Sequence, residues 1–165
     1  MESIRTERLL LRSPLPSDLE PMHRILSDPA AMRYWSSLPH SSLDDTRAWL
    51  DAMIAAPASE SCDFIIDLDG EPIGKAGCHR LPEIGYILHP DHWGRGYAAE
   101  ALAAVIPHIF AGHDIAALRA DVDPRNHASI RLLERLGFAP AGSARRTWLI
   151  GEEYCDSLYF ELRRA

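Results

Sequence analysis

The sequence predicts one domain over residues 1–165 in which helices surround one sheet, an α+β or α/β fold with an antiparallel majority. The length of 165 residues falls within the usual range of a single domain. An apolar share of 47% and a charged share of 25% are typical of globular proteins. The spacing of apolar residues switches repeatedly between the periods of a helix and of a strand, which indicates a mixed fold.

The amino-terminal third predicts a short strand followed by two helices. Residues 9–11 are three leucines that precede a turn. A helix is expected to begin at Ser17, because Glu20 three residues later completes a capping-box pattern. A second helix is expected over residues 43–56, with Ser42 as its N-cap.

The middle of the chain predicts three antiparallel strands. Residues 64–68 and 72–78 flank Asp69-Gly70, a dipeptide typical of tight hairpin turns. A third strand is expected over residues 83–88, ended by a proline at position 90. Together these segments predict a meander.

The remaining segments predict two more helices, a strand and a closing hairpin. A helix follows Gly96, and Pro107 within it predicts a kink or an early end. Alternation predicts a strand over residues 118–122, and helical spacing predicts a helix over residues 126–136. Residues 148–162 have the pattern of a hairpin. Together with the two helices expected earlier in the chain, about four helices are expected to flank the sheet.

Composition excludes several classes of protein. The net charge of −7 and a pI near 5.6 argue against a dedicated nucleic-acid binder. No apolar run approaches the ~20 residues of a membrane span, and the first residues lack the core of a signal peptide. Cys62, Cys78 and Cys155 form no CxxC pair, so reduced thiols and a cytoplasmic location are expected.

The turn Trp93-Gly94-Arg95-Gly96 is the first candidate binding element. It joins a strand to a helix, whose first turn leaves about four N–H groups unpaired and favours anions. Glycines let these amides approach a bulky phosphate, and Arg95 adds a positive charge. The pattern is typical of a phosphate or pyrophosphate site, although Gly-x-Gly before a helix also occurs in ordinary loops.

Two polar segments allow a structural and a functional interpretation. Asn126 is a favoured N-cap for the helix that follows it, and Ser129 in its first turn can contact the cap or a ligand. His89, Asp91 and His92 could suggest a metal site, but Pro90 interrupts them and a solvated loop is the expected interpretation.

Several motifs together resemble the GNAT superfamily of N-acetyltransferases, and within it the RimJ/RimL branch of ribosomal-protein N-terminal acetyltransferases. The similarity spans nearly the whole chain. Its motifs occur in the order of that branch and lie at residues 6–12, 83–86, 93–101, 126–138 and 156–163. Trp93 stands where the superfamily usually has a basic or amide residue, and this departure is itself similar to the branch.

The resemblance implies a splayed, mostly antiparallel sheet with acetyl-CoA in the split beside residues 83–88. It implies main-chain pairing with the pantetheine, binding of the pyrophosphate by a run of amides, and contacts near the sulfur. The residues concerned are Ile87 and Leu88 for the pantetheine, Gly94, Arg95, Gly96, Tyr97 and Ala98 for the pyrophosphate, and Asn126 and Ser129 for the sulfur end. Tyr34, Trp35 and Trp49 would border the acceptor site or belong to the core.

The chemistry requires an acceptor for the amine's proton and stabilisation of an oxyanion. Glu83 resembles the general base of some relatives and would act directly or through water. Backbone N–H groups near Leu88 would stabilise the oxyanion. Many relatives place a tyrosine acid where this chain has Leu133, so Ser129 would protonate the thiolate, or the thiolate would leave without an acid.

The sequence therefore predicts an acetyl-CoA-dependent N-acetyltransferase without a metal, acting as a monomer or homodimer. Its acceptor would be a protein N-terminus or a small-molecule amine, and the charge of −7 favours a cationic one. A non-catalytic acyl-CoA-binding module is the alternative.

Overall fold

The computed structural model describes all residues, 1–165, as one eight-stranded sheet with four α-helices. Short 3₁₀ turns, η1 (Pro16–Asp18) and η2 (Pro90–His92), precede α1 and α3. The elements in chain order are β1 (Ile4–Arg5), β2 (Leu10–Arg12), α1 (Leu19–Leu26), α2 (Leu43–Ala55), β3 (Cys62–Leu68), β4 (Glu71–Arg80), β5 (Glu83–Leu88), α3 (Tyr97–Gly112), β6 (Ala117–Val122), α4 (His127–Arg135), β7 (Ala139–Ile150) and β8 (Glu153–Arg163).

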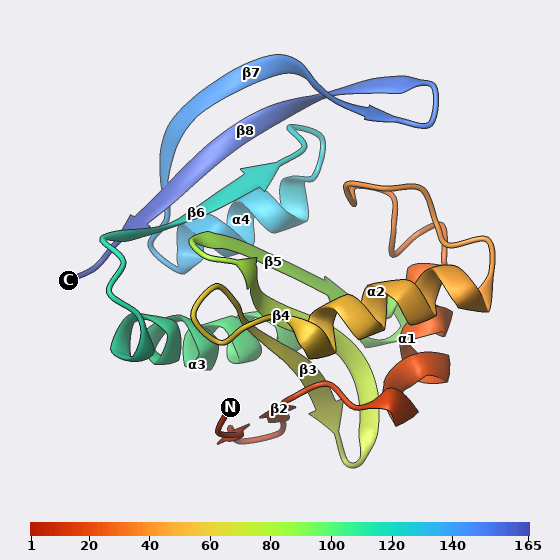
Figure 1. Cartoon of the computed structure of the whole chain (residues 1–165). Helices are drawn as coiled ribbons and strands as arrows, with labels where there is room; N and C mark the ends of the chain where they lie inside the picture. Colours follow the sequence, from red (N-terminus) through yellow and green to blue (C-terminus); the bar gives the residue numbers. More distant parts are fainter.

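The sheet is splayed at its centre, as expected. Its strand order is β1-β2-β3-β4-β5-β6-β8-β7, and every pair is antiparallel except β5 with β6. That parallel pair has a single register position, Glu83 opposite Arg119, after which the two strands diverge (Figure 1). One edge of β5 therefore stays open beyond its first residue.

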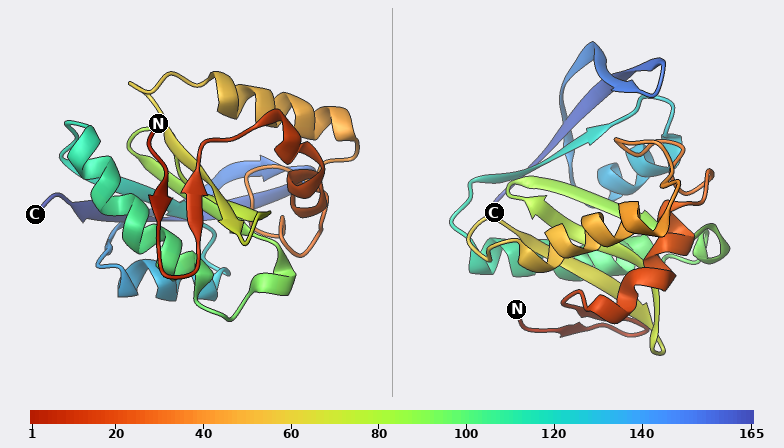
Figure 2. Two further views of the ribbon diagram at one scale, coloured as in Figure 1. Left: turned by 90° about the horizontal axis from the view of Figure 1, so that it is seen from below. Right: turned by 45° about the vertical axis from the view of Figure 1, so that its right-hand side comes forward.

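Helices cover both faces of the sheet, and the strands bury side chains on both. In β3, Phe64 and Ile66 belong to the core beneath α3, whereas Ile65 belongs to the core beneath α1. Leu133 of α4 is fully buried in the first of these cores. The views in Figure 2 place α2 and α4 on opposite sides of the strands. The β7–β8 hairpin arches away from this body (Figure 1).

The start of α1 differs from the expectation, and the prediction of a capping box formed by Ser17 and Glu20 is wrong. A 3₁₀ turn precedes the helix, and the Asp18 carboxylate accepts the Leu15 N–H at 2.7 Å. Asp18 is buried and also binds Arg12 at 2.8 Å. This ion pair with β2 decides where the chain turns into the helix. At α2, by contrast, Ser42 caps the helix as expected, accepting from the Asp45 N–H.

Pro107 does not end α3, so the expectation of an early end is wrong. The helix continues to Gly112. Proline removes one N–H and thereby frees the carbonyl four residues earlier, that of Ala103. Both residues are exposed, so water can satisfy that carbonyl while Ile106 and Ile109 stay in the core. None of the helices has the length and apolarity that crossing a membrane requires.

Candidate active site

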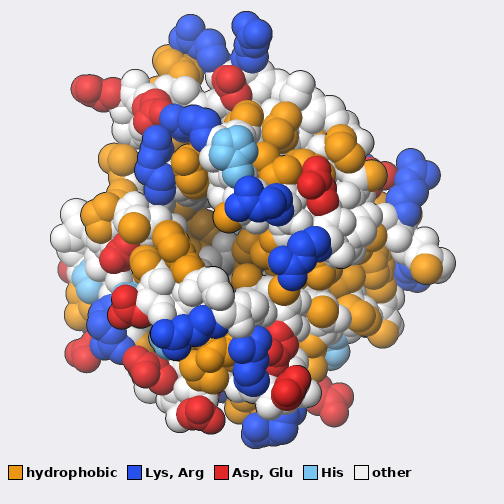
Figure 3. All heavy atoms as spheres, turned by 180° about the vertical axis from the view of Figure 1, so that it is seen from behind, with side chains coloured by type: hydrophobic (Ala, Val, Ile, Leu, Met, Phe, Trp, Pro, Cys, Tyr) orange, Lys and Arg blue, Asp and Glu red, His pale blue; other side chains and the backbone are white.

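The turn before α3 presents a run of free amides. Gly94 and Gly96 have φ values of +74° and +81°, which favour glycine because a Cβ crowds the backbone there. The N–H groups of residues 94–99 donate to no acceptor in the protein, and the Glu100 N–H is the first to pair, with Gly96 O at 3.0 Å. The side on which α4 lies is hollowed near its centre, and arginine side chains stand around the hollow (Figure 3). This geometry fits a polyanion such as a pyrophosphate.

A contact between distant motifs anchors this turn. Arg8 Nε binds Glu100 Oε2 at 2.6 Å, and Arg8 Nη1 donates to the Arg95 carbonyl at 2.8 Å. The Arg8 guanidinium also lies over the Tyr97 ring, 4.4 Å from its centroid. Burial alone would raise the pKa of Glu100, but hydrogen bonds from Thr6 and Arg8 lower it, so the carboxylate stays ionised. Sequence reasoning noted both motifs but not that they meet.

The open edge of β5 leads toward this turn. The Trp93 indole Nε1 donates to the Leu88 carbonyl at 3.1 Å, which ties the turn to the end of the strand. The Ile87 carbonyl faces β4, since a Cβ built on Gly74 would lie 2.1 Å from its oxygen. Arg95 is exposed and Tyr97 is buried. Trp93 thus contributes a hydrogen bond within the protein where the superfamily pattern has a polar side chain.

The start of α4 lies across the split from β5. Asn126 is the N-cap of α4, and its Oδ1 accepts the Ser129 N–H at 3.3 Å. The Ser129 hydroxyl shares a hydrogen bond with the hydroxyl of Tyr86, on β5. Burial raises the pKa of Tyr86 to about 12, although the bond with Ser129 lowers it. Sequence reasoning assigned no role to the Tyr86 hydroxyl, because strand alternation alone does not identify its partner.

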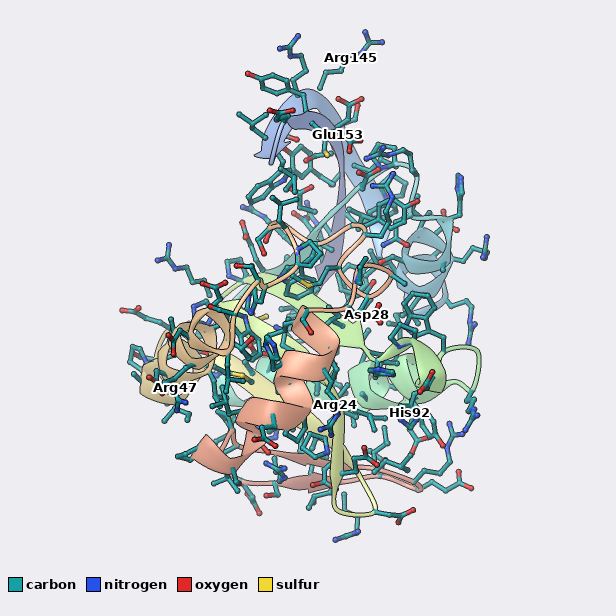
Figure 4. The ribbon with its side chains drawn as sticks, turned by 90° about the vertical axis from the view of Figure 1, so that its right-hand side faces the viewer. Arg24, Asp28, Arg47, His92, Arg145 and Glu153 are labelled. Atoms are coloured by element: carbon teal, nitrogen blue, oxygen red, sulfur yellow. The ribbon has the colours of Figure 1, made fainter.

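A cleft of about 520 Å³ lies against the segment that follows α1. Tyr34 and Trp35 line it, whereas Trp49 packs against the core beneath α1. Figure 4 shows Glu153 on the projecting β7–β8 hairpin, above the segment that follows Asp28. The carboxylates that line the cleft are Glu83, Asp121, Asp123, Glu153 and Asp156.

These carboxylates differ in their partners. Arg125 binds Asp123 and Glu153, each at 2.7 Å, and the hydrogen bond from Arg125 lowers the pKa of Asp123. Glu83, at the exposed first position of β5, forms no ion pair, and the same holds for the carboxylates at 121 and 156. Five carboxylates line the cleft against Arg33, Lys75 and Arg80, so negative charge is in excess and can attract an amine.

A buried ion pair forms part of the cleft floor. Lys75 Nζ on β4 binds both oxygens of Asp63 on β3, at 2.9 and 3.0 Å, and each side chain is at most 4% exposed. Gly85 lacks a side chain beside it, since a Cβ there would lie 3.7 Å from Nζ. Trp35 lies over the ammonium, its ring centroid 5.9 Å away. Sequence reasoning did not single out this pair.

The histidines near the turn form no metal centre in this structure. His89 Nδ1 accepts the Asp91 N–H at 3.2 Å, and no three His, Cys, Asp or Glu side chains are grouped so as to hold a metal. All three cysteines are free, with Cys62 and Cys78 buried. Burial raises the pKa of Cys62 to about 11 and of Cys78 to about 12, so both thiols stay protonated.

Comparison with known proteins assigns the family. Residues 8–139 match the model of the acetyltransferase (GNAT) domain, which covers most of the chain and all the elements from β2 to α4. The chain belongs to the GNAT acetyltransferase family. It is an acetyl-CoA-dependent N-acetyltransferase, and the free amides at 94–99 fit the phosphates of that co-substrate.

Other GNAT proteins share its length and fold. An uncharacterized N-acetyltransferase, p20 of Bacillus licheniformis, is 31% identical over 88% of this chain and 86% of its own. A GNAT acetyltransferase of Bacillus anthracis superposes with a TM-score of 0.85 at 27% identity, covering 98% of both chains. RimL, a ribosomal L7/L12 α-N-protein acetyltransferase solved with coenzyme A, superposes at 0.86 with 21% identity over 98% of both chains. The last likeness is one of fold.

Proposed function

We propose that residues 1–165 form a single N-acetyltransferase domain of the RimJ/RimL type that acetylates a primary amine held in the acidic cleft. One observation carries the proposal: the two halves of the site meet at β5. Its open edge and the six free amides beyond it suit acetyl-CoA, while Glu83 on the same strand lines the cleft. An acceptor in the cleft would therefore approach an acetyl group lying along β5.

Each part of the site has a proposed role. The amides from Gly94 to Ala98, with Arg95, hold the phosphates. Main-chain groups of Ile87 and Leu88 align the pantetheine. The Leu88 N–H contributes most, because the Ile87 carbonyl faces β4 and the Leu88 carbonyl already accepts a hydrogen bond from Trp93. Asn126 shapes the first turn of α4 and brings Ser129 to the sulfur.

The transfer itself is assigned to two side chains. Glu83 takes the proton from the attacking amine, directly or through a water molecule, since its carboxylate is exposed to the cleft. Ser129 stabilises the departing thiolate. Leu133 supports this assignment, because it is fully buried and no hydroxyl is available at that position of α4.

The cleft favours an acceptor with a positive charge. Its carboxylates stand beside Tyr34 and Trp35, whose rings can pack on the carbon chain of an amine. A protein N-terminus and a small-molecule amine both satisfy this chemistry. The related RimL acts on a ribosomal protein, which supports the first. Free cysteines fit a reducing cytoplasm, and a monomer or homodimer suffices for the site.

The deciding experiment measures release of the CoA thiol with a panel of N-terminal peptides and small amines. Turnover is expected for at least one cationic amine. Glu83→Gln should lower kcat about 100-fold, within the usual contribution of a general base, whereas Glu134→Gln on the exposed side of α4 should not change it. Tight acetyl-CoA binding without turnover for any amine would instead indicate a non-catalytic acyl-CoA-binding module.

A further inference from the structure

The hydroxyls of Tyr86 and Ser129 form a link between the two sides of the split sheet. Tyr86 comes from β5 and Ser129 from the first turn of α4, 43 residues later. The Ser129 backbone is already held by Asn126, so the serine does not need the tyrosine to keep its place on the helix. The hydrogen bond with Tyr86 therefore affects the orientation of the Ser129 hydroxyl rather than the position of its backbone.

The direction of this hydrogen bond decides what Ser129 can do. A serine hydroxyl has one proton to donate and two lone pairs to accept with. If it donated to Tyr86, it would have no proton left for a sulfur atom. A phenol is the better donor of the two, because its ordinary pKa of about 10 is far below that of an alcohol. The high pKa of Tyr86 keeps this donor protonated over the whole physiological range.

We propose that Tyr86 is a positioning residue that donates to Ser129 Oγ and thereby directs the Ser129 proton at the CoA sulfur. This inference rests on the proposed function, in which Ser129 faces the sulfur. As the C–S bond breaks, its electron pair moves to sulfur and the nitrogen–carbon bond of the amide is complete. The amine's proton goes to Glu83, and Ser129 keeps its own proton while hydrogen-bonding the thiolate. Consecutive donors in one direction strengthen each other, so Tyr86 increases the stabilisation that Ser129 provides.

The test needs no acceptor amine. Wild type, Tyr86→Phe, Ser129→Ala and the double variant are titrated calorimetrically with CoA and with desulfo-CoA between pH 6 and pH 10. The ratio of the two affinities measures the sulfur's interaction alone, and its pH profile reports the pKa of the bound thiol. Tyr159→Phe, which removes a hydroxyl from β8, is the matched control.

In wild type, the pKa of the bound thiol should lie at least about one unit below that of free CoA, since a hydrogen bond to a charged group is worth that much. Tyr86→Phe should remove most of this shift, Ser129→Ala all of it, and the double variant no more than Ser129→Ala. Desulfo-CoA affinity should stay within about two-fold throughout, and the control should match wild type.

Three results would overturn the inference. Tyr86→Phe with the wild-type thiol pKa would mean that Ser129 needs no orientation. Equal losses for CoA and desulfo-CoA would mean that Tyr86 has only a structural role. A wild-type profile in Ser129→Ala would mean that the sulfur lies elsewhere. None of these abolishes CoA binding, whereas a wild type that binds neither compound would refute the proposed function as well.

Discussion

Lys75→Met isolates the contribution of the buried ion pair at the cleft floor. Methionine has nearly the length of lysine and can occupy the space between Gly85 and the Trp35 ring without the ammonium. The Asp63 carboxylate, only 3% exposed, then loses both of its bonds to Nζ. Removing one partner of a buried pair leaves an uncompensated charge, which costs about 3–5 kcal/mol.

The loss is large enough to measure by urea unfolding at pH 7. Domains are usually stable by only about 5–15 kcal/mol, and urea slopes are about 1–3 kcal/mol/M. A loss of about 4 kcal/mol with a slope near 2 kcal/mol/M moves the midpoint down by about 2 M. The slope itself should stay constant, because the fold and its buried surface do not change.

The double variant Asp63→Asn with Lys75→Met provides the control, since it removes both charges at nearly constant volume. Asparagine is chosen because it has nearly the shape and volume of the aspartate that it replaces, which is buried. The double variant should recover at least about 2 kcal/mol relative to Lys75→Met. If it is no more stable than the single variant, lost packing rather than an unpaired charge explains the effect, and the reasoning is refuted.

Three further predictions concern the turn before α3, its anchor Glu100, and His40. Gly96→Val should weaken acetyl-CoA binding at least ten-fold, as measured by calorimetry. The reason is that a side chain at φ +81° displaces the amides and would meet Arg8 Nη2 at 3.3 Å. The control is Gly70→Val, at φ +90° in a remote open turn, which should leave the affinity unchanged. Glu100→Gln should lower the affinity for acetyl-CoA several-fold, because the carboxylate holds both the backbone and the side chain of Arg8. An unchanged affinity would show that this anchor is dispensable. Burial lowers the pKa of His40 below its ordinary value of 6.5, so the folded protein holds fewer protons there than the unfolded chain. The unfolding free energy should therefore fall as the pH drops below about 7, and it should fall less in His40→Gln. An identical pH dependence in that variant would exclude the histidine.

Features that depend on neighbours in the chain could be predicted from the sequence. Ser42 caps α2 because its oxygen reaches an N–H three residues ahead. The glycines before α3 and the Asn126 cap before α4 are equally local. Where a local rule failed, a distant group had intervened: Arg12 of β2 holds Asp18, and α1 begins after Asp18, at Leu19, rather than at Ser17.

By itself, then, the sequence determined the order of the elements from β2 onward, the family motifs and the glycine turn before α3, because periodicity, capping and backbone freedom act over a few residues. Only the tertiary structure decided which side chains meet. Arg8 with Glu100, Asp63 with Lys75 and Tyr86 with Ser129 are separated by 92, 12 and 43 residues. Their contacts depend on strand register and on where the sheet splits, and both are set by burying two cores at once rather than by any local pattern.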